Sequence, residues 1–184
     1  MIAENLHQVI FSDSGSRITS DNKNPTLRFK GVQLIANDHF THTAQCHYIF
    51  DSCHILAVKY IGAISVTATG SIFEVQTGQN TYIFSNSGPV DIKNCIFVDH
   101  NDRQPTDSYL TGAVSGTIKS CIFYAKYPRG TCINPSHNAV LTKCATENIT
   151  NPENGVLFSE NLGFMDIDNK NYNLRPLSPL IGKG

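Results

Sequence analysis

The sequence repeats a short pattern of apolar residues at a nearly constant interval. The segment "DIKNCIFVDH", residues 91–100, is followed by "TIKSCIFYAK", residues 117–126, with a cysteine in the same place. The pattern consists of two apolar positions separated by one residue, two bend residues, and two further apolar positions separated by one residue. It recurs about every 22 residues through most of the chain. Its third apolar positions are Val32, Cys53, Val75, Cys95, Cys121 and Cys144.

This repeat predicts a solenoid. Alternation of apolar and polar residues indicates a β-strand with one buried face, and the extra residue lets the chain bend while both strands keep their apolar side inward. A strand, a bend, a second strand and a return segment then make one coil. Because a single coil cannot bury its inner face, coils stack with parallel strands about 4.8 Å apart. About seven or eight short coils fit the chain of 184 residues.

The bend positions suit a corner that faces solvent. Five of the six pairs are polar or contain glycine, and only Phe73-Glu74 departs from this. The pairs are Lys30-Gly31, Asp51-Ser52, Phe73-Glu74, Lys93-Asn94, Lys119-Ser120 and Thr142-Lys143.

The third apolar positions are predicted to form a stack inside the tube, where cysteine packs as a small apolar side chain. Inward parallel stacking rarely has the geometry of a disulfide, so we predict free thiols at the four cysteines of the stack. Cys46 and Cys132 lie outside it, and the pattern does not say whether they pair.

Composition and charge narrow the function classes. The formal net charge is −1, which predicts no broad basic face and no nucleic-acid partner. No apolar run reaches about 18 residues, so no membrane-spanning helix is expected. The N-terminal segment lacks the features of a secretory signal, so we expect that the protein stays where it is made, that a signal was removed, or that the chain is a piece of a longer one. A phage structural protein released by lysis also lacks a signal, and a phage protein or a processed chain would lie at a virion or extracellular surface. No Cys-x-x-Cys pair occurs, and no metal or cofactor is predicted.

Two segments resemble one known group of proteins. "IKNCIF" and "IKSCIF" are similar to the coil motif of the right-handed parallel β-helix proteins of the pectate-lyase-like superfamily. "GFMDIDNKNYNLRPLSPLIGKG", residues 163–184, resembles the terminal segment that closes the last coil in many of them. The resemblance covers residues 27–184 and implies one all-β domain, a single-stranded right-handed parallel β-helix. We therefore expect coils over 27–162 and a closing segment over 163–184, with residues 1–26, a partner chain or a further domain covering the N-terminal end.

Two loops carry the candidate site residues. They are "DHNDRQPTDSYLTG", residues 99–112, and "YAKYPRGTCINPSHN", residues 124–138, at the same level of successive coils. A lyase that removes the proton next to a uronate carboxylate needs a basic residue and a cation, and the available cations are Arg103, Lys126 and Arg129. A glycoside hydrolase needs a carboxylate pair, for which Asp99 and Asp102 are available.

Substrate contacts are expected from polar and aromatic side chains of the same loops. These are Asp99, His100, Asp102, Asp107, Tyr109, Tyr127 and His137. An ordinary solvated loop is the alternative interpretation. The histidine-rich segment "DHFTHTAQCH", residues 38–47, fits the spacing of no common metal site and is interpreted as a loop.

Two classes of function remain open. The first is a non-catalytic carbohydrate-associated or virion structural module, assembled as a homo-oligomer. The second is an enzyme that acts on an acidic polysaccharide, with a lyase favoured over a hydrolase. A fragment of a longer surface protein, whose active coils are absent, is a third hypothesis.

Overall fold

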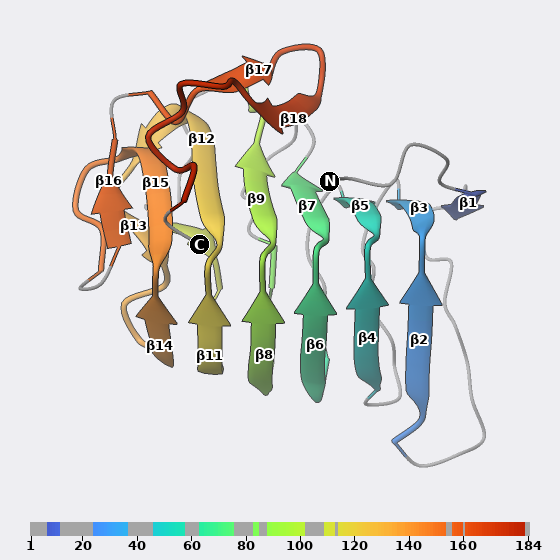
Figure 1. Ribbon diagram of the computed structural model, residues 1–184. Coiled ribbons are helices and arrows are strands. Elements are labelled where there is room, and N and C mark those ends of the chain that lie inside the picture. Colours follow the sequence, from blue (N-terminus) through green and yellow to red (C-terminus); the bar gives the residue numbers. More distant parts are fainter. Residues whose placement is uncertain are drawn as a thin grey trace.

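The computed structural model describes residues 7–11, 24–36, 46–57, 63–75, 83–84, 88–101, 109–112, 114–153, 156–159 and 161–182. These residues form strands and no helix. Most strands belong to two parallel sheets that run side by side along the molecule (Figure 1). The predicted all-β parallel solenoid is therefore confirmed.

The first sheet, sheet A, has eight parallel strands. In spatial order these are β1 (His7–Phe11), β3 (Val32–Ala36), β5 (His54–Ala57), β7 (Ile72–Val75), β9 (Ile96–Asp99), β12 (Ile122–Arg129), β15 (Cys144–Ile149) and β16 (Val156–Phe158).

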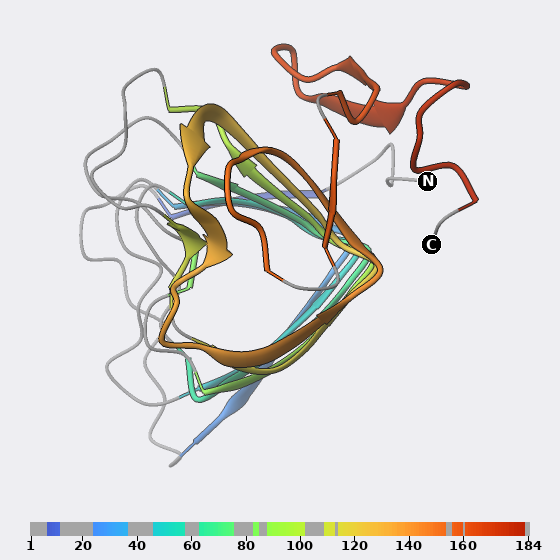
Figure 2. The ribbon, with the colours of Figure 1, turned by 90° about the vertical axis from the view of Figure 1, so that its left-hand side faces the viewer.

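The second sheet, sheet B, has six parallel strands. These are β2 (Thr26–Lys30), β4 (His47–Asp51), β6 (Ser65–Thr69), β8 (Pro89–Lys93), β11 (Ser115–Lys119) and β14 (Asn138–Thr142). Each strand of sheet B is followed by a corner and then by a strand of sheet A, as the view along the stack shows (Figure 2). The described residues thus contain six strand–corner–strand coils, fewer than the seven or eight predicted.

A third, shorter wall completes the tube in the later coils. β10 (Tyr109–Thr111) pairs in parallel with β13 (Thr131–Ile133). Ile83 N–H donates to Leu110 O at 3.1 Å, which places residues 83–84 beside β10. Phe84 is fully buried and packs edge-on against Phe73 and Phe97 inside the tube. The interior is therefore closed on three sides by backbone at this level.

Every corner has a residue in the left-handed backbone region. The corner residues, with φ between 53° and 60°, are Gly31, Ser52, Gly70, Asn94, Ser120 and Lys143. The N–H groups of the first five bond across to the next coil, as in Ser52 N–H to Thr69 O at 2.9 Å and Asn94 N–H to Lys119 O at 3.1 Å. Five corners lie at the predicted bend pairs. The third lies at Gly70 instead of Phe73-Glu74.

The shift of the third corner changes one member of the predicted stack. Val32, Cys53, Cys95, Cys121 and Cys144 each follow a corner, and Ser71 takes the corresponding position in the third coil. Ser71 Oγ accepts from Cys53 N at 3.1 Å, and Ser71 N–H donates to Cys95 Sγ at 3.5 Å. Val75 lies further along its strand, in register with Ala57 and Asp99. All six cysteines are buried and have free thiols.

The core is a row of large side chains that repeats from coil to coil. Phe97 stacks on Phe123 with ring centroids 4.8 Å apart and on Phe73 at 5.3 Å, with the rings nearly parallel in both pairs. Leu34 and Ile55 continue this row toward the N-terminal end, in register with Phe73. Each side chain covers its neighbour, so a coil is stabilised by the coils on either side.

The segment after β15 covers the C-terminal end of the tube. Val156 of β16 packs against the core, and its strand adds to sheet A beside β15. The Glu153 carboxylate accepts from the backbone N–H groups of Cys132 at 3.2 Å and Ile133 at 2.7 Å. This segment therefore satisfies backbone groups and covers apolar side chains that the last coil would leave open.

The final segment folds back along the outside of sheet A. β17 (Phe164–Asp166) and β18 (Asn171–Leu174) form an antiparallel hairpin that lies outside the tube (Figure 2). Its apolar residues pack against outward-facing side chains of β7, β9, β12 and β15. We call residues 161–182 the C-terminal arm. The arm was expected to close the last coil, whereas it lies across several coils at once.

Substitutions at two glycines distinguish backbone strain at a corner from a steric clash between closely packed strands. A Cβ at Gly70 (φ +58°) would meet only Ser52 Oγ at 3.8 Å, so we expect Gly70→Ala to lower the free energy of unfolding by about 1–2 kcal/mol through backbone strain. A Cβ at Gly116 (φ +100°) would lie 2.2 Å from Val90 O, and Gly116→Ala should cost clearly more. Chemical denaturation measures both, and equal losses would contradict this packing of β8 on β11.

Candidate functional site

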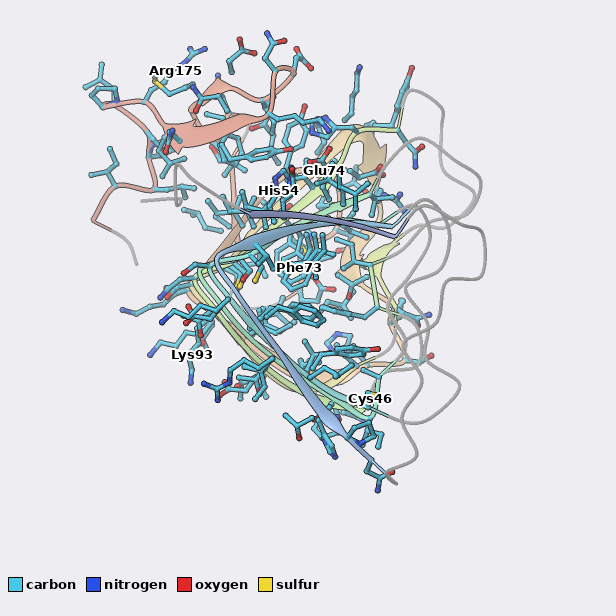
Figure 3. All side chains as sticks on the ribbon, turned by 90° about the vertical axis from the view of Figure 1, so that its right-hand side faces the viewer. Cys46, His54, Phe73, Glu74, Lys93 and Arg175 are labelled. Carbon is cyan, nitrogen blue, oxygen red and sulfur yellow. The ribbon has the colours of Figure 1, made fainter. Side chains whose placement is uncertain are left out.

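The outer face of sheet A carries a buried carboxylate beneath the C-terminal arm. Glu74 of β7 points outward from the tube, in register with Leu56 of β5 and Val98 of β9. It is only 1% exposed because the arm covers it. Figure 3 shows Glu74 and His54 on the outer side of sheet A, facing the arm.

Four side chains surround this carboxylate. His54 Nε2 lies 2.8 Å from Glu74 Oε2, and the Tyr172 hydroxyl donates to the same oxygen at 2.9 Å. Lys170 Nζ lies 2.6 Å from Oε1. His100 Nε2 lies 2.9 Å from the Tyr172 hydroxyl. We call these five residues the Glu74 cluster.

The hydrogen bonds of the cluster show which ring nitrogen of His100 carries a hydrogen. A tyrosine hydroxyl carries a single hydrogen, and that of Tyr172 is donated to Glu74. His100 Nε2 must therefore be the donor to Tyr172. Burial lowers the pKa of His100 below its ordinary value, so the ring is neutral at neutral pH.

The charges around Glu74 outweigh the effect of its burial. Burial alone would raise the pKa of this carboxyl, but hydrogen bonds and positive charge from His54 and Lys170 lower it to about 2. Burial raises the pKa of Tyr172, and the neighbouring Glu74 charge adds to this. Glu74 is therefore ionised and Tyr172 protonated throughout the physiological range.

This arrangement acts as an anchor for the arm. Lys170 and Tyr172 belong to the arm, whereas Glu74, His54 and His100 belong to the solenoid. Around the ionic contact, Phe164 of the arm packs edge-on against Tyr124 of β12, with ring centroids 6.2 Å apart. A carboxylate that is buried, ionised and fully hydrogen-bonded is a poor proton donor or acceptor, so the geometry favours a structural role for the cluster.

Two of the predicted site residues meet inside the tube. Arg129 forms an ion pair with Asp99, with Nε to Oδ2 at 3.0 Å, and the other Asp99 oxygen accepts from Asn101 N–H at 2.9 Å. Asp99 is 0% exposed and Arg129 is 2% exposed. The predicted base and substrate-binding carboxylate are thus neighbours, and each neutralises the other in the interior.

The other predicted site residues are spread over the molecule. His100 belongs to the Glu74 cluster, while Lys126 and Tyr127 are exposed on β12. His137 is half-buried, and its Nδ1 accepts from Ala139 N–H at 3.1 Å. Only the backbone of Tyr109 is described, in β10. Arg103, Asp102 and Asp107 lie outside the described residues.

Neither a group of metal-ligating side chains nor a helix suited to a membrane is found in the described part of the chain. Its histidine, cysteine and acidic residues form no group of three or more that could hold a metal ion. Most of the histidine-rich segment 38–47 lies outside the described residues, and His47 Nδ1 there contacts Ser65 Oγ at 2.6 Å. Over the same described residues, no helix is long and apolar enough to cross a membrane.

A groove lies between the corner of the solenoid and the arm. It has a volume of about 450 Å³ and extends into a second hollow of about 120 Å³, with which it shares Ser120, Ile122 and Leu174. Outward-facing isoleucines of sheet A line one side, and residues 172–174 of the arm line another. The groove leaves space for a ligand between the arm and the corner of the solenoid.

Comparisons with known protein families, with curated proteins and with solved structures find no match for this chain. The parallel solenoid is established by the structure itself.

The Glu74 cluster was missed because Glu74 was assigned to a bend. The sequence does carry one sign of the cluster, because "SIFEV" places a single acidic residue among apolar ones. In the structure every residue of β7 is buried, Glu74 included. Lys170 and Tyr172 were read only as part of a terminal motif. Glu74, the partner of Tyr172, is 98 positions away in the sequence, and no local pattern indicates such a contact.

Replacing Glu74 tests the anchor. The pKa of Glu74 falls from its ordinary 4.5 to about 2 on folding, so its charge stabilises the folded state above pH 4.5, and this contribution is lost as the pH falls toward 2. We expect Glu74→Gln to lower the free energy of unfolding by about 3 kcal/mol at pH 7. Chemical denaturation at several pH values measures it.

The pH dependence of the loss in unfolding free energy distinguishes an ionic anchor from other causes of destabilisation. The difference between Glu74→Gln and the wild type should shrink below pH 4.5, as the wild type loses the same charge. Asp91→Asn is the matched control, because Asp91 forms an exposed ion pair with Lys93 and should contribute less than about 1 kcal/mol. A loss that is the same at every pH would contradict an ionic anchor.

Proposed function

We propose that this chain is a non-catalytic structural β-solenoid that associates with carbohydrate at a virion or extracellular surface. The observation that carries the proposal is the pairing of its candidate acid–base groups. Asp99 and Arg129 are buried against each other, and Glu74 and His100 are held beneath the arm. Groups bound in this way are not available to a polysaccharide substrate.

The architecture supports a role as a scaffold. Each coil contacts its neighbours through the core row and the corner hydrogen bonds, which makes a stiff rod. We assign the chain to the pectate-lyase-like superfamily as part of this proposal, on the coil motif and the terminal segment. A shared solenoid does not itself imply the enzyme activity of other members, because function depends on the residues at a site.

Exposed apolar side chains support assembly into a homo-oligomer. Leu177 on the arm is 95% exposed and Ile181 is 55% exposed. Leu157 of β16 and Val140 of β14, both on the last strand of a sheet, are also exposed. Exposed apolar groups on the arm and on the last strand of each sheet favour contact with another chain.

Incubation with a panel of acidic and neutral polysaccharides tests the proposal. We expect binding in affinity electrophoresis, no ultraviolet absorbance from an unsaturated uronate product, and no new reducing ends. Light scattering on the same sample should give a mass above the 20.2 kDa of one chain.

Turnover of a uronate polymer that is lost in Lys126→Ala would overturn the non-catalytic proposal in favour of a lyase.

A further inference from the structure

The groove beside the arm has a continuous aliphatic floor. Ile72, Ile96 and Ile122 line it and lie in register on β7, β9 and β12. Ala145 of β15, in register with Ile122, continues this row into the smaller hollow. Ile96 and Ile122 are only half-buried, so a ligand in the groove can contact them. The floor therefore presents apolar side chains at steps of about 4.8 Å along the axis.

The wall that the arm supplies is aliphatic as well. Leu174 lines both hollows and Leu180 lines the smaller one, and both leucines are half-buried. The polar residues Asn94 and Ser120 lie at the corner, along the outer edge of the groove. Four corners line the groove between residues 70 and 143, which is roughly 14 Å along the axis. The result is an elongated groove with aliphatic side chains on two sides.

The groove offers no aromatic ring to a ligand. Among the described residues that line the two hollows, Tyr172 is the only aromatic one. It is 3% exposed, and its hydroxyl is bound to Glu74. Nucleic-acid bases and other ring ligands gain much of their binding energy by packing on exposed aromatic faces. The lining therefore suits a flexible aliphatic chain better than a ligand built of rings.

The charge of the lining lies at one end. Lys143, at the corner of the last coil, is the only charged residue among the described residues that line the two hollows, and it lines the smaller one. Lys119 ends β11 just before the neighbouring corner and adds a second positive charge one coil away. This end of the groove therefore favours an anionic group.

A fatty carboxylate matches this distribution of apolar and charged groups. A peptide or a polysaccharide would place polar groups against the aliphatic lining along its whole length, and polar groups that lose water without a hydrogen-bond partner cost free energy. A fatty carboxylate has its polar group at one end only, as the groove does. With carbon–carbon bonds of about 1.5 Å, an extended chain of about ten to twelve carbons spans the groove.

We propose that this groove binds a single fatty carboxylate, with the acyl chain along the isoleucine floor and the carboxylate beside Lys143. The inference goes beyond the proposed association with carbohydrate and does not depend on it. The arm forms one wall of the site, so the Glu74 cluster that anchors the arm also positions this wall.

Titration calorimetry of the full chain with soluble monomeric fatty carboxylates tests the proposal. We expect dodecanoate to bind more than about tenfold more tightly than octanoate, because additional methylene groups leave water. Tetradecanoate should gain little over dodecanoate, since the groove ends at the corner of the last coil. Dodecanol should bind more weakly than dodecanoate, because it brings no charge to Lys143.

Two sets of variants locate the chain and its head group. Ile96→Thr/Ile122→Thr keeps the branched shape that strands favour and should lower the affinity for dodecanoate by more than about tenfold. Val140→Thr is the matched control, because Val140 is 59% exposed on sheet B and lies outside the groove. Lys143→Gln should weaken the binding of dodecanoate and leave that of dodecanol unchanged.

Three results would contradict the proposal. Absence of dodecanoate binding to the wild type would overturn the site, and so would unchanged binding in the double isoleucine variant at an unchanged melting temperature. Equal affinities of the wild type for dodecanol and dodecanoate would overturn the place of the carboxylate beside Lys143. The series of chain lengths and Lys143→Gln keep the test valid if the double variant does not fold. Sedimentation with phosphatidylglycerol vesicles, without binding of free dodecanoate, would overturn the site in favour of a membrane surface.

Discussion

The structure depends on the hydrogen bonds that join one corner to the next. A residue with positive φ turns the chain between sheets B and A, and its N–H bonds to the carbonyl of the following coil, as Gly70 does to Lys93 O at 3.1 Å. Because each corner repeats the same geometry, the strands on both sides stay in register. The phenylalanine row inside and the isoleucine row outside follow from that register.

The arm connects several coils that would otherwise contact only their immediate neighbours. A solenoid relies on contacts between neighbouring coils alone, so each coil boundary is a point where it can open. The arm instead contacts β7, β9, β12 and β15 together. Glu74 fixes it at one end of this span, where two arm residues meet a carboxylate that is ionised despite its burial. The same contact shapes the groove.

Repetition explains what the sequence could predict. Cys95 and Cys121 lie in identical local patterns, so their common position beside the corner could be read directly. The prediction of the third corner is wrong because it treats Gly70 as an apolar strand position. This places the corner at Phe73-Glu74 and assigns Val75 to the stack, whereas the corner lies at Gly70 and Ser71 takes that position. The pairing of Asp99 with Arg129 and the contact of Tyr172 with Glu74 join distant segments once each. Such contacts have no period and leave no local pattern.

Cysteine pairs on the outer face of sheet B test the coil register most directly. Thr67 of β6 and Asp91 of β8 are directly opposite in the parallel pairing, at a spacing of about 4.8 Å. Thr67→Cys/Asp91→Cys should therefore be cross-linked by dibromobimane, a thiol reagent whose short span requires two neighbouring sulfurs, as detected by mass spectrometry of the peptides. Thr67→Cys/Lys93→Cys, shifted by two residues on the same face, should not be cross-linked. A cross-link in the shifted pair, or in neither pair, would contradict the stacking of the coils.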